Sequence, residues 1–252
     1  MKWLKLKWLN FLAGGIGKSL TKNFLKLGCT VVCVDLNQEE LDKLEDELNS
    51  KVKLKPLHKH VFFYNFDISD VDQVKENCKR IREEVGDVNI LINNAAIMNK
   101  AKLLLELNEK EIKNIFNVNI LSQFWLCKEF LPKMIETNKG HIVNVSSSLG
   151  FFGAYKLTDY CATKFAVVGF SESLRVELKS MNSNNRIVVS TVCPFHVKTK
   201  LFNGFELECF KWMNLSNSVD VVSDQITKGV LANKNLIGCP RFEFFILAAV
   251  KK

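Results

Sequence analysis

The chain has 252 residues, of which 47% are hydrophobic and 25% are charged, so it is long enough to bury a sizeable core. The net charge of +8 comes from lysines spread along the chain without a nucleic-acid-binding motif, and we therefore expect no nucleic acid partner. No apolar run reaches the roughly 18 residues that a transmembrane helix needs.

Strand patterns and helix patterns alternate along the chain, which predicts an α/β fold with a parallel sheet covered by helices. The predicted strands are short and apolar, and most are rich in β-branched residues: 6–10, 30–34, 61–64, 89–92, 140–145, 187–192 and 235–239. The strand at 6–10 fits this pattern least well. Because no linker or internal repeat interrupts the alternation, residues 1–252 are predicted to form a single domain.

The predicted helices are segments with helical periodicity or a polar pattern: 14–27, 37–49, 69–85, 108–135, 158–181 and 221–231. Asn37 is a plausible N-cap of the second helix with Glu40 as its capping-box partner, and Ser69 is predicted to cap the third. Residues 195–218 lack a clear period and are interpreted as a loop or lid on the substrate side.

Cysteine and histidine spacing predicts no metal site. None of the eight cysteines forms a Cys-x-x-Cys pair, and several lie in apolar runs. The four histidines have no metal-ligand spacing near carboxylates or cysteines. Buried, reduced thiols are therefore favoured over a disulfide framework or a zinc site.

The segment 147–164 contains three residues suited to proton transfer. Tyr160 and Lys164 are four residues apart on a predicted helix, so their side chains share one face. A cation close to a phenol lowers its pKa from about 10, which suits the tyrosine to exchange a proton with an alcohol or a carbonyl. Ser147, which follows an apolar strand, can hydrogen-bond the same substrate oxygen. Alone, the Tyr-x-x-x-Lys spacing is a weak signal that also occurs on solvated helix faces.

A glycine cluster near the N-terminus suits a dinucleotide. Gly15, Ile16 and Gly17 lie where a predicted strand turns into a helix, and glycines let backbone amides approach a pyrophosphate. Asp35 ends the next strand, where a carboxylate accepts hydrogen bonds from ribose hydroxyls and repels a 2′-phosphate. This favours NAD over NADP. The cluster alone is also compatible with a simple turn.

Taken together, these motifs resemble the short-chain dehydrogenase/reductase family, whose fold is a doubly wound (Rossmann) parallel sheet. The segments 140–148 and 193–202 look most like the retinol dehydrogenase and 17β-hydroxysteroid dehydrogenase branch. The matching segments follow the family's order and spacing: GGIG (14–17), Asp35, FDIS (66–69), LINNAA (91–96), NVN (117–119), GHIVNVSSS (140–148), YCATK (160–164) and CPFHVKT (193–199).

The resemblance implies a role for each matching residue. Tyr160 would be the general acid and base, Lys164 would lower its pKa and bind the nicotinamide ribose, and Ser147 would orient the substrate oxygen. Asn119 would hold a water in the proton relay. The remaining cofactor contacts would come from Asp67 and Ile68 beside the adenine, Asn94 and Ala95 along the cofactor, and Val197 and Thr199 at the carboxamide. The substrate would be a lipophilic alcohol or ketone.

Four residues depart from the family pattern. Asn10 and Phe11 replace the Thr and first Gly of the glycine turn, Lys7 falls in a strand that should be buried, and Ala96 replaces a usual Gly. Phe11 is therefore expected to crowd the ribose–pyrophosphate region and weaken NADH binding. Two functions stay open: an active NAD-dependent dehydrogenase, or a truncated or cofactor-defective relative that binds a lipid or a partner.

The chain ends suggest a membrane location for the protein, and two helices suggest a dimer interface. The basic, tryptophan-bearing segment 1–12 and the apolar segment 242–252 are expected to dock on an anionic membrane without spanning it. The resemblance implies the cytoplasmic face of the endoplasmic reticulum or a lipid droplet, and otherwise the cytoplasm. It also implies a homodimer formed through the helices at 108–135 and 158–181.

Overall fold

The computed structural model describes residues 7–11, 14–50, 60–199, 201 and 217–239. Seven parallel strands form one sheet in the order β3-β2-β1-β4-β5-β6-β7. Their bounds lie within two residues of those predicted: β1 Lys7–Phe11, β2 Thr30–Asp35, β3 Val61–Asn65, β4 Ile90–Asn93, β5 Gly140–Val145, β6 Ile187–Pro194 and β7 Leu236–Cys239. The predicted α/β class with a doubly wound parallel sheet is thus confirmed.

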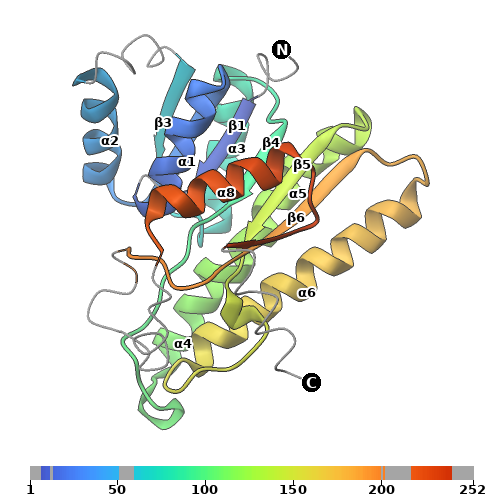
Figure 1. Cartoon of the computed structure of the whole chain (residues 1–252). Coiled ribbons are helices and arrows are strands. Elements are labelled where there is room, and N and C mark those ends of the chain that lie inside the picture. Colours follow the sequence, from blue (N-terminus) through green and yellow to red (C-terminus); the bar gives the residue numbers. More distant parts are fainter. Residues whose placement is uncertain (1–6, 12–13, 51–59, 200, 202–216, 240–252) are drawn as a thin grey trace.

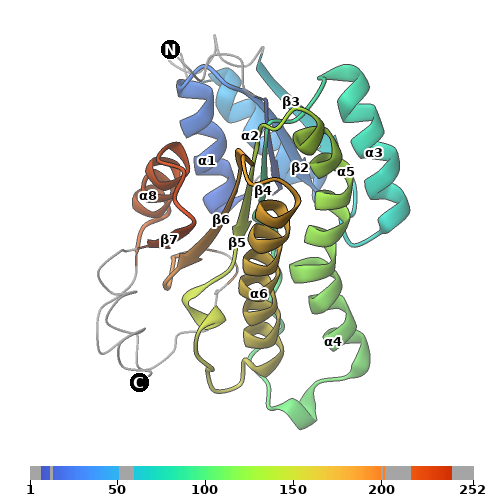
Figure 2. The same ribbon diagram turned by 90° about the vertical axis from the view of Figure 1, so that its right-hand side faces the viewer.

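Helices cover both faces of the sheet (Figure 1). Viewed after a quarter turn, α1 and α8 lie on one side of the strands, and α3, α5 and α6 lie on the other (Figure 2). The α-helices are α1 Gly15–Lys26, α2 Gln38–Ser50, α3 Val71–Glu84, α4 Glu109–Phe116, α5 Ser122–Glu136, α6 Thr158–Met181 and α8 Val219–Leu231. Short 3-10 turns stand at η2 Leu104–Glu106 and η4 Ser148–Gly150.

Two hydrophobic layers hold these helices to the sheet. One layer packs α1, α2 and α8 residues such as Leu20, Leu44 and Ile226 against the strands. The other packs α3, α5 and α6 residues, including Ile81 and Phe130, against the opposite face. Because a parallel sheet is buried on both faces, its strands are apolar runs rather than alternating patterns, and this explains why they were recognisable in the sequence.

The third helix begins later than its predicted cap. Asp70, not Ser69, is the N-cap of α3, and its side chain accepts hydrogen bonds from the backbone amides of Asp72 and Gln73. Ser69 instead donates its hydroxyl to Asp67, at 2.7 Å. Both residue types are good caps, and the position of the turn after β3 decided between them.

The helix predicted at 108–135 is interrupted. A π-helical turn, η3 Asn117–Leu121, separates α4 from α5 and contains the fully buried Asn119. Hydrophobic periodicity continues through the segment, so the interruption is invisible to a helical pattern. Such π-turns occur often at functional sites.

Strand β1 includes the residues that depart from the family's glycine turn. Asn10 and Phe11 align with Cys33 and Val34 of β2 and so belong to the strand instead of the turn. The crowding predicted for the Phe11 side chain falls outside the described part of the structure. Lys7 begins the strand, and its half-buried side chain reaches the turn at Gly86, so its charge does not enter the centre of the sheet.

The described cysteines agree with the expected buried thiols. Seven are buried and free of disulfide bonds, while Cys209 lies outside the described residues. Within the described residues, no group of three potential ligands is placed to hold a metal ion. No helix among them is long and apolar enough to cross a membrane.

Candidate active site

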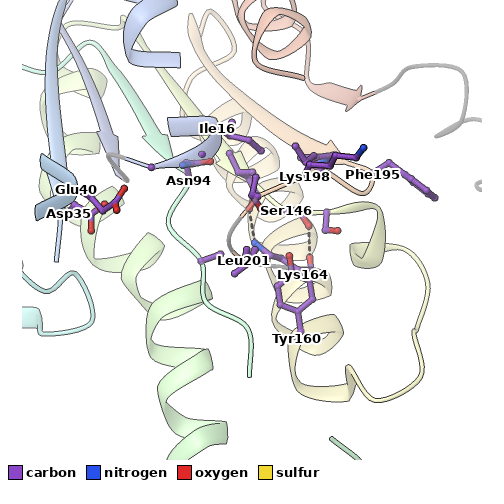
Figure 3. A pocket seen from close by; sticks show the side chains of 18 of the residues that line it. Ile16, Asp35, Glu40, Asn94, Ser146, Tyr160, Lys164, Phe195, Lys198 and Leu201 are labelled. Atoms are coloured by element: carbon purple, nitrogen blue, oxygen red, sulfur yellow. Dashed lines mark hydrogen bonds between the residues drawn. The ribbon is translucent and has the colours of Figure 1, made fainter. Parts of the chain in front are cut away.

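A cavity of about 610 Å³ opens at the carboxyl ends of the strands. It lies where the strand order reverses, between β1 and β4, which is the usual place for a ligand in an open parallel sheet. Its volume falls within the range of roughly 300–1,000 Å³ that is typical of ligand pockets. Its lining includes a glycine turn, a pair of carboxylates, and the serine, tyrosine and lysine of the predicted catalytic set (Figure 3).

The glycine turn has the properties of an anion site. Gly14 caps α1 without a side-chain hydrogen bond, and the first turn of that helix has no acidic residue. Gly15 has φ +52°, a conformation that favours glycine, and a Cβ there would lie 3.4 Å from the Thr199 side chain. The turn therefore presents backbone amides at a helix N-terminus and has no side chains that would obstruct a ligand. Both properties fit the pyrophosphate of a dinucleotide.

The carboxylates line a second part of the cavity. Asp35 ends β2, and its carboxylate accepts a hydrogen bond of 2.9 Å from the backbone amide of Asn37. The Asn37 side-chain oxygen accepts from the amide of Glu39, so Asn37 caps α2 as predicted. The backbone amide of Asn37, which the predicted capping box would pair with Glu40, donates to Asp35 instead. The Glu40 side chain lines the cavity beside Asp35.

Ser147, Tyr160 and Lys164 come together as their spacing predicted. Tyr160 and Lys164 lie one turn apart on α6 and are 3% and 1% exposed, so both polar groups are nearly dry. The Lys164 ammonium lies 5.5 Å from the centre of the Tyr160 ring and donates to the carbonyl of Val145 at 3.1 Å. That carbonyl ends β5, the strand that delivers Ser147.

Burial dominates the electrostatics of this group. It raises the pKa of Tyr160 above its ordinary value, and a hydrogen bond with Ser147 opposes the shift. It lowers the pKa of Lys164 to about 8. The sequence predicted the opposite direction for Tyr160, because helix spacing reveals the neighbouring cation but not the loss of water around the phenol.

The close packing of η4 against α6 places Ser147. The Ser147 hydroxyl oxygen accepts from the amide of Leu149 at 3.1 Å, which fixes the side chain as the cap of η4. A Cβ on Gly150 would lie 2.8 Å from the carbonyl of Lys164 and 2.6 Å from the Ser146 hydroxyl. Only a residue without a side chain allows this approach, which brings Ser147 to Tyr160.

Asn119 lies behind the cavity instead of lining it. Its side-chain amide donates to the carbonyl of Ile97 at 2.9 Å and to the hydroxyl of Thr163 at 3.1 Å, and its oxygen accepts from the Ile97 amide at 2.8 Å. Thr163 in turn donates to the carbonyl of Tyr160. Asn119 thus joins the loop after β4 to the helix that bears Tyr160, and its role in a proton relay stays a prediction.

The other predicted cofactor residues divide into two groups. Gly15, Ile16, Asp35, Asn94, Val197 and Thr199 line the cavity. Gly17, Asp67, Ile68 and Ala95 do not: Asp67 organises the turn before α3, and Ile68 and Ala95 pack in the core. Phe195, Lys198 and Leu201 line the cavity and belong to the loop that the sequence placed on the substrate side. Glu40, Ala96 and Ser146 also line it but were not assigned to a site from the sequence. A polar helix start gave no signal that the Glu40 side chain faces the cavity.

Comparison with known proteins places this site in a family context. The family model described as short chain dehydrogenase matches residues 12–208. Short-chain dehydrogenase/reductase family 16C member 6 of Bos taurus is 34% identical over 93% of this chain and 72% of its own length. Epidermal retinol dehydrogenase 2 of Mus musculus is 34% identical over 92% and 73%, and retinol dehydrogenase 10-B of Danio rerio is 37% identical over 77% and 61%.

Solved structures share the fold. A short-chain dehydrogenase/reductase from Burkholderia phymatum in complex with NAD has a TM-score of 0.82 at 20% identity, covering 94% of this chain and 90% of that one. A short-chain dehydrogenase from Sphingobium yanoikuyae in complex with NADPH has a TM-score of 0.81 at 22% identity, covering 98% and 93%. The two differ in coenzyme, so the shared fold leaves the choice between NAD and NADP to the residues of each cavity.

Proposed function

The chain belongs to the short-chain dehydrogenase family, and from this premise we propose that it transfers hydride between NAD and a lipophilic, retinol- or steroid-like alcohol or ketone. Membership makes it an NAD(P)-dependent oxidoreductase. The observation that carries the proposal is the convergence of Ser147, Tyr160 and Lys164 on a cavity whose glycine turn fits a dinucleotide. This convergence favours the enzyme over a relative that only binds a lipid or a partner.

In the proposed reaction the chain's own residues bind, orient and move a proton. Tyr160 donates its phenolic proton to the substrate oxygen in reduction and accepts it in oxidation. Burial keeps the phenol protonated at neutral pH, which suits the reductive direction. Ser147 holds the substrate oxygen, and Lys164 keeps most of its positive charge at pH 7 because its pKa is about 8. When bound, the nicotinamide supplies or accepts the hydride.

The surroundings of Tyr160 support a lipophilic substrate. Tyr160 belongs to an apolar cluster with Ile115, Leu149 and Leu157, against which Leu201 packs. Phe195 adds an aromatic ring to the lining of the cavity. A polar alcohol would leave its other hydroxyls without partners in such surroundings, whereas a hydrocarbon skeleton would gain from burial. Residues 202–216, the larger part of the predicted lid, lie outside the described residues.

The coenzyme proposal rests on charge. Asp35 and Glu40 line the cavity together, and a 2′-phosphate placed against them would meet two negative groups. We therefore favour NAD over NADP, as the sequence predicted from Asp35 alone.

Substitution of Tyr160 by Phe tests the proposed mechanism. The variant keeps the ring but loses the transferable proton, so we expect turnover of a retinol-like alcohol to fall by about 10²–10⁴-fold. Tyr155→Phe is the matched control, since Tyr155 is 73% exposed and lies five residues earlier. NADH fluorescence should show that both variants still bind coenzyme. Turnover by Tyr160→Phe at the level of the control would exclude Tyr160 as the acid and base.

We also propose peripheral association with a membrane, such as the endoplasmic reticulum or a lipid droplet surface. The sequence suggested this from the two chain ends, but residues 7–11 form the inner strand β1, so that part of the N-terminal segment belongs to the sheet and is not a membrane contact. Residues 1–6, 12 and 242–252 lie outside the described residues. A different surface supports it: Leu103, Leu104 and Leu105 are 43%, 55% and 97% exposed, and Tyr155 is close by because Lys102 and Lys156 share a backbone hydrogen bond. Exposed leucines that cluster in this way commonly mark an interaction site.

We also propose a homodimer, again from exposed apolar side chains. Exposed apolar side chains on α5 and α6, namely Phe124, Phe165 and Val176, support packing of a second copy against these helices. The molar mass of the purified protein in solution, measured by light scattering, would decide it.

A further inference from the structure

Asp159 precedes Tyr160 on α6 and is buried, although the proposed reaction does not use it. Its side chain is 7% exposed, and a buried carboxylate is costly unless it is hydrogen-bonded. One carboxylate oxygen accepts from the backbone amide of Tyr160 at 2.8 Å, and the other accepts from the side-chain amide of Asn99 at 2.7 Å. Asp159 therefore joins the residue proposed as acid and base to a segment 60 residues away in the sequence.

The bond to Tyr160 satisfies an amide that the helix cap does not reach. The N-cap of α6 is Leu157, whose side chain makes no capping hydrogen bond. The first amides of a helix have no carbonyl partner within that helix, and the amide of Tyr160 is one of them. The Asp159 carboxylate lies in the same first turn and accepts from this amide. The turn that bears Tyr160 is thus held by Asp159 and not by its cap residue.

The bond to Asn99 holds the other side of the Tyr160 ring. Asn99 also donates to the backbone carbonyl of Glu111 on α4, at 3.3 Å. Ile97 and Met98, which directly precede Asn99, pack against the apolar cluster that contains Tyr160. The segment after β4, the helix α4 and the first turn of α6 are therefore linked around this ring through the Asp159–Asn99 bond.

A purely structural role would not require this arrangement. Asp70 shows what such a role looks like, since it caps α3 by accepting from the amides of Asp72 and Gln73 while it remains exposed. A carboxylate in a first helical turn is favoured by the helix dipole whether or not it is buried. The burial of Asp159 and its bond to Asn99 thus exceed what the start of a helix needs.

Resting on the proposed role of Tyr160, we propose that Asp159 is a positioning residue that, together with Asn99, holds the Tyr160 hydroxyl against the substrate oxygen. Asp159 does not line the cavity, so it acts through Tyr160 and touches neither substrate nor coenzyme. Its loss lets the first turn of α6 shift. A displacement of about 1 Å at a reacting group can lower the rate by about a hundredfold.

Turnover of a retinol-like alcohol, NADH affinity by fluorescence and melting temperature test this assignment in the full chain. Asp159→Ala should lower kcat by about 10- to 100-fold, because the hydroxyl is no longer held in place. Its Kd for NADH should change by less than about threefold. Asp159→Asn keeps one oxygen for the Tyr160 amide and should stay within about threefold of the native kcat.

Asp70→Ala is the matched control, because it also removes a carboxylate that accepts from amides at a helix start. It should lower the melting temperature by about 2–4 °C and leave kcat unchanged, since Asp70 has no bond to the segment that holds Tyr160. All rates are compared well below the melting temperature of every variant.

A reciprocal exchange tests the bond between the two side chains. Asn99→Asp places a second carboxylate against Asp159, and the repulsion should lower kcat as Asp159→Ala does. Adding Asp159→Asn restores one donor and one acceptor, so the double variant should recover most of the lost turnover. A double variant as slow as Asn99→Asp would overturn the assignment.

The remaining outcomes separate this inference from the proposed function. If Tyr160→Phe loses turnover while Asp159→Ala keeps the native kcat, the proposed function stands and Asp159 has no positioning role. If Asp70→Ala loses as much kcat as Asp159→Ala does, both carboxylates only stabilise the fold, which also overturns the assignment. If Tyr160→Phe turns over as fast as the native protein, the proposed function fails, and the inference fails with it.

Discussion

Replacement of Asn119 by alanine should destabilise the protein more than the small loss of side-chain volume suggests. Asn119 is fully buried in the π-turn and makes three hydrogen bonds, two with the backbone of Ile97 and one with Thr163. Alanine would leave the Ile97 amide and carbonyl and the Thr163 hydroxyl without this partner.

The magnitude follows from those groups. Each buried polar group left unsatisfied costs about 1–3 kcal/mol, but Ile97 is only half-buried, so water can partly replace the lost partner. We therefore expect the free energy of unfolding to fall by about 3 kcal/mol. In a chain of this size, that fall lowers the melting temperature by about 6–12 °C.

Urea denaturation followed by circular dichroism measures the effect. Asn114→Ala is the matched control, because Asn114 is an exposed asparagine on the preceding helix α4. Coenzyme oxidation or reduction should also slow in Asn119→Ala, since Thr163 links Asn119 to the carbonyl of Tyr160. A loss of stability below about 0.5 kcal/mol, the usual range for surface substitutions, would refute the view that the π-turn is anchored by this side chain.

Two further predictions concern pH and surface. Burial lowers the pKa of His141 to about 4, and its ring nitrogen lies 2.7 Å from the Ser190 hydroxyl, so folding favours the neutral form. Between pH 6.5 and pH 4, His141 therefore binds a proton in the unfolded chain but not in the folded chain. Stability should fall by about 3 kcal/mol as the pH drops from about 6.5 to 4, and this dependence should disappear in His141→Gln, as urea midpoints at several pH values would show. The double variant Leu104→Ser and Leu105→Ser should float less with anionic vesicles than the native protein does. The control Val176→Ser, at an exposed site on α6, should float as the native protein does. Equal flotation of the two variants would exclude Leu103–Leu105 as the membrane-binding surface.

The sequence was sufficient for features that depend on neighbouring residues. The strands were visible because burial on both faces makes each a continuous apolar run, as in β2 with Val31, Val32 and Val34. Tyr160 and Lys164 met because a spacing of four fixes a helix face. Ser147 could be added because strand β5 ends just before it, at the edge where parallel strands place their ligands.

Features that depend on distant contacts were not predictable. The π-turn around Asn119 is set by bonds to Ile97 and Thr163, which lie 22 and 44 residues away in the sequence. Glu40 has the pattern of a capping residue, and only the fold shows that its carboxylate faces the glycine turn. The raised pKa of Tyr160 likewise depends on the removal of water by surrounding elements, which no local pattern records.

The order of the strands has a consequence for the growing chain. β1 pairs with β2 on one side and β4 on the other, so it lies inside the finished sheet although its residues are synthesised before those of the other described strands. Until Asn93 has left the ribosome, the β4 side of β1 remains an open edge. Open edges recruit strands from other chains, and a lysine on an edge hinders this. Lys7 at the start of β1 therefore places a charge on this open edge, whereas in the finished sheet its side chain reaches the turn at Gly86.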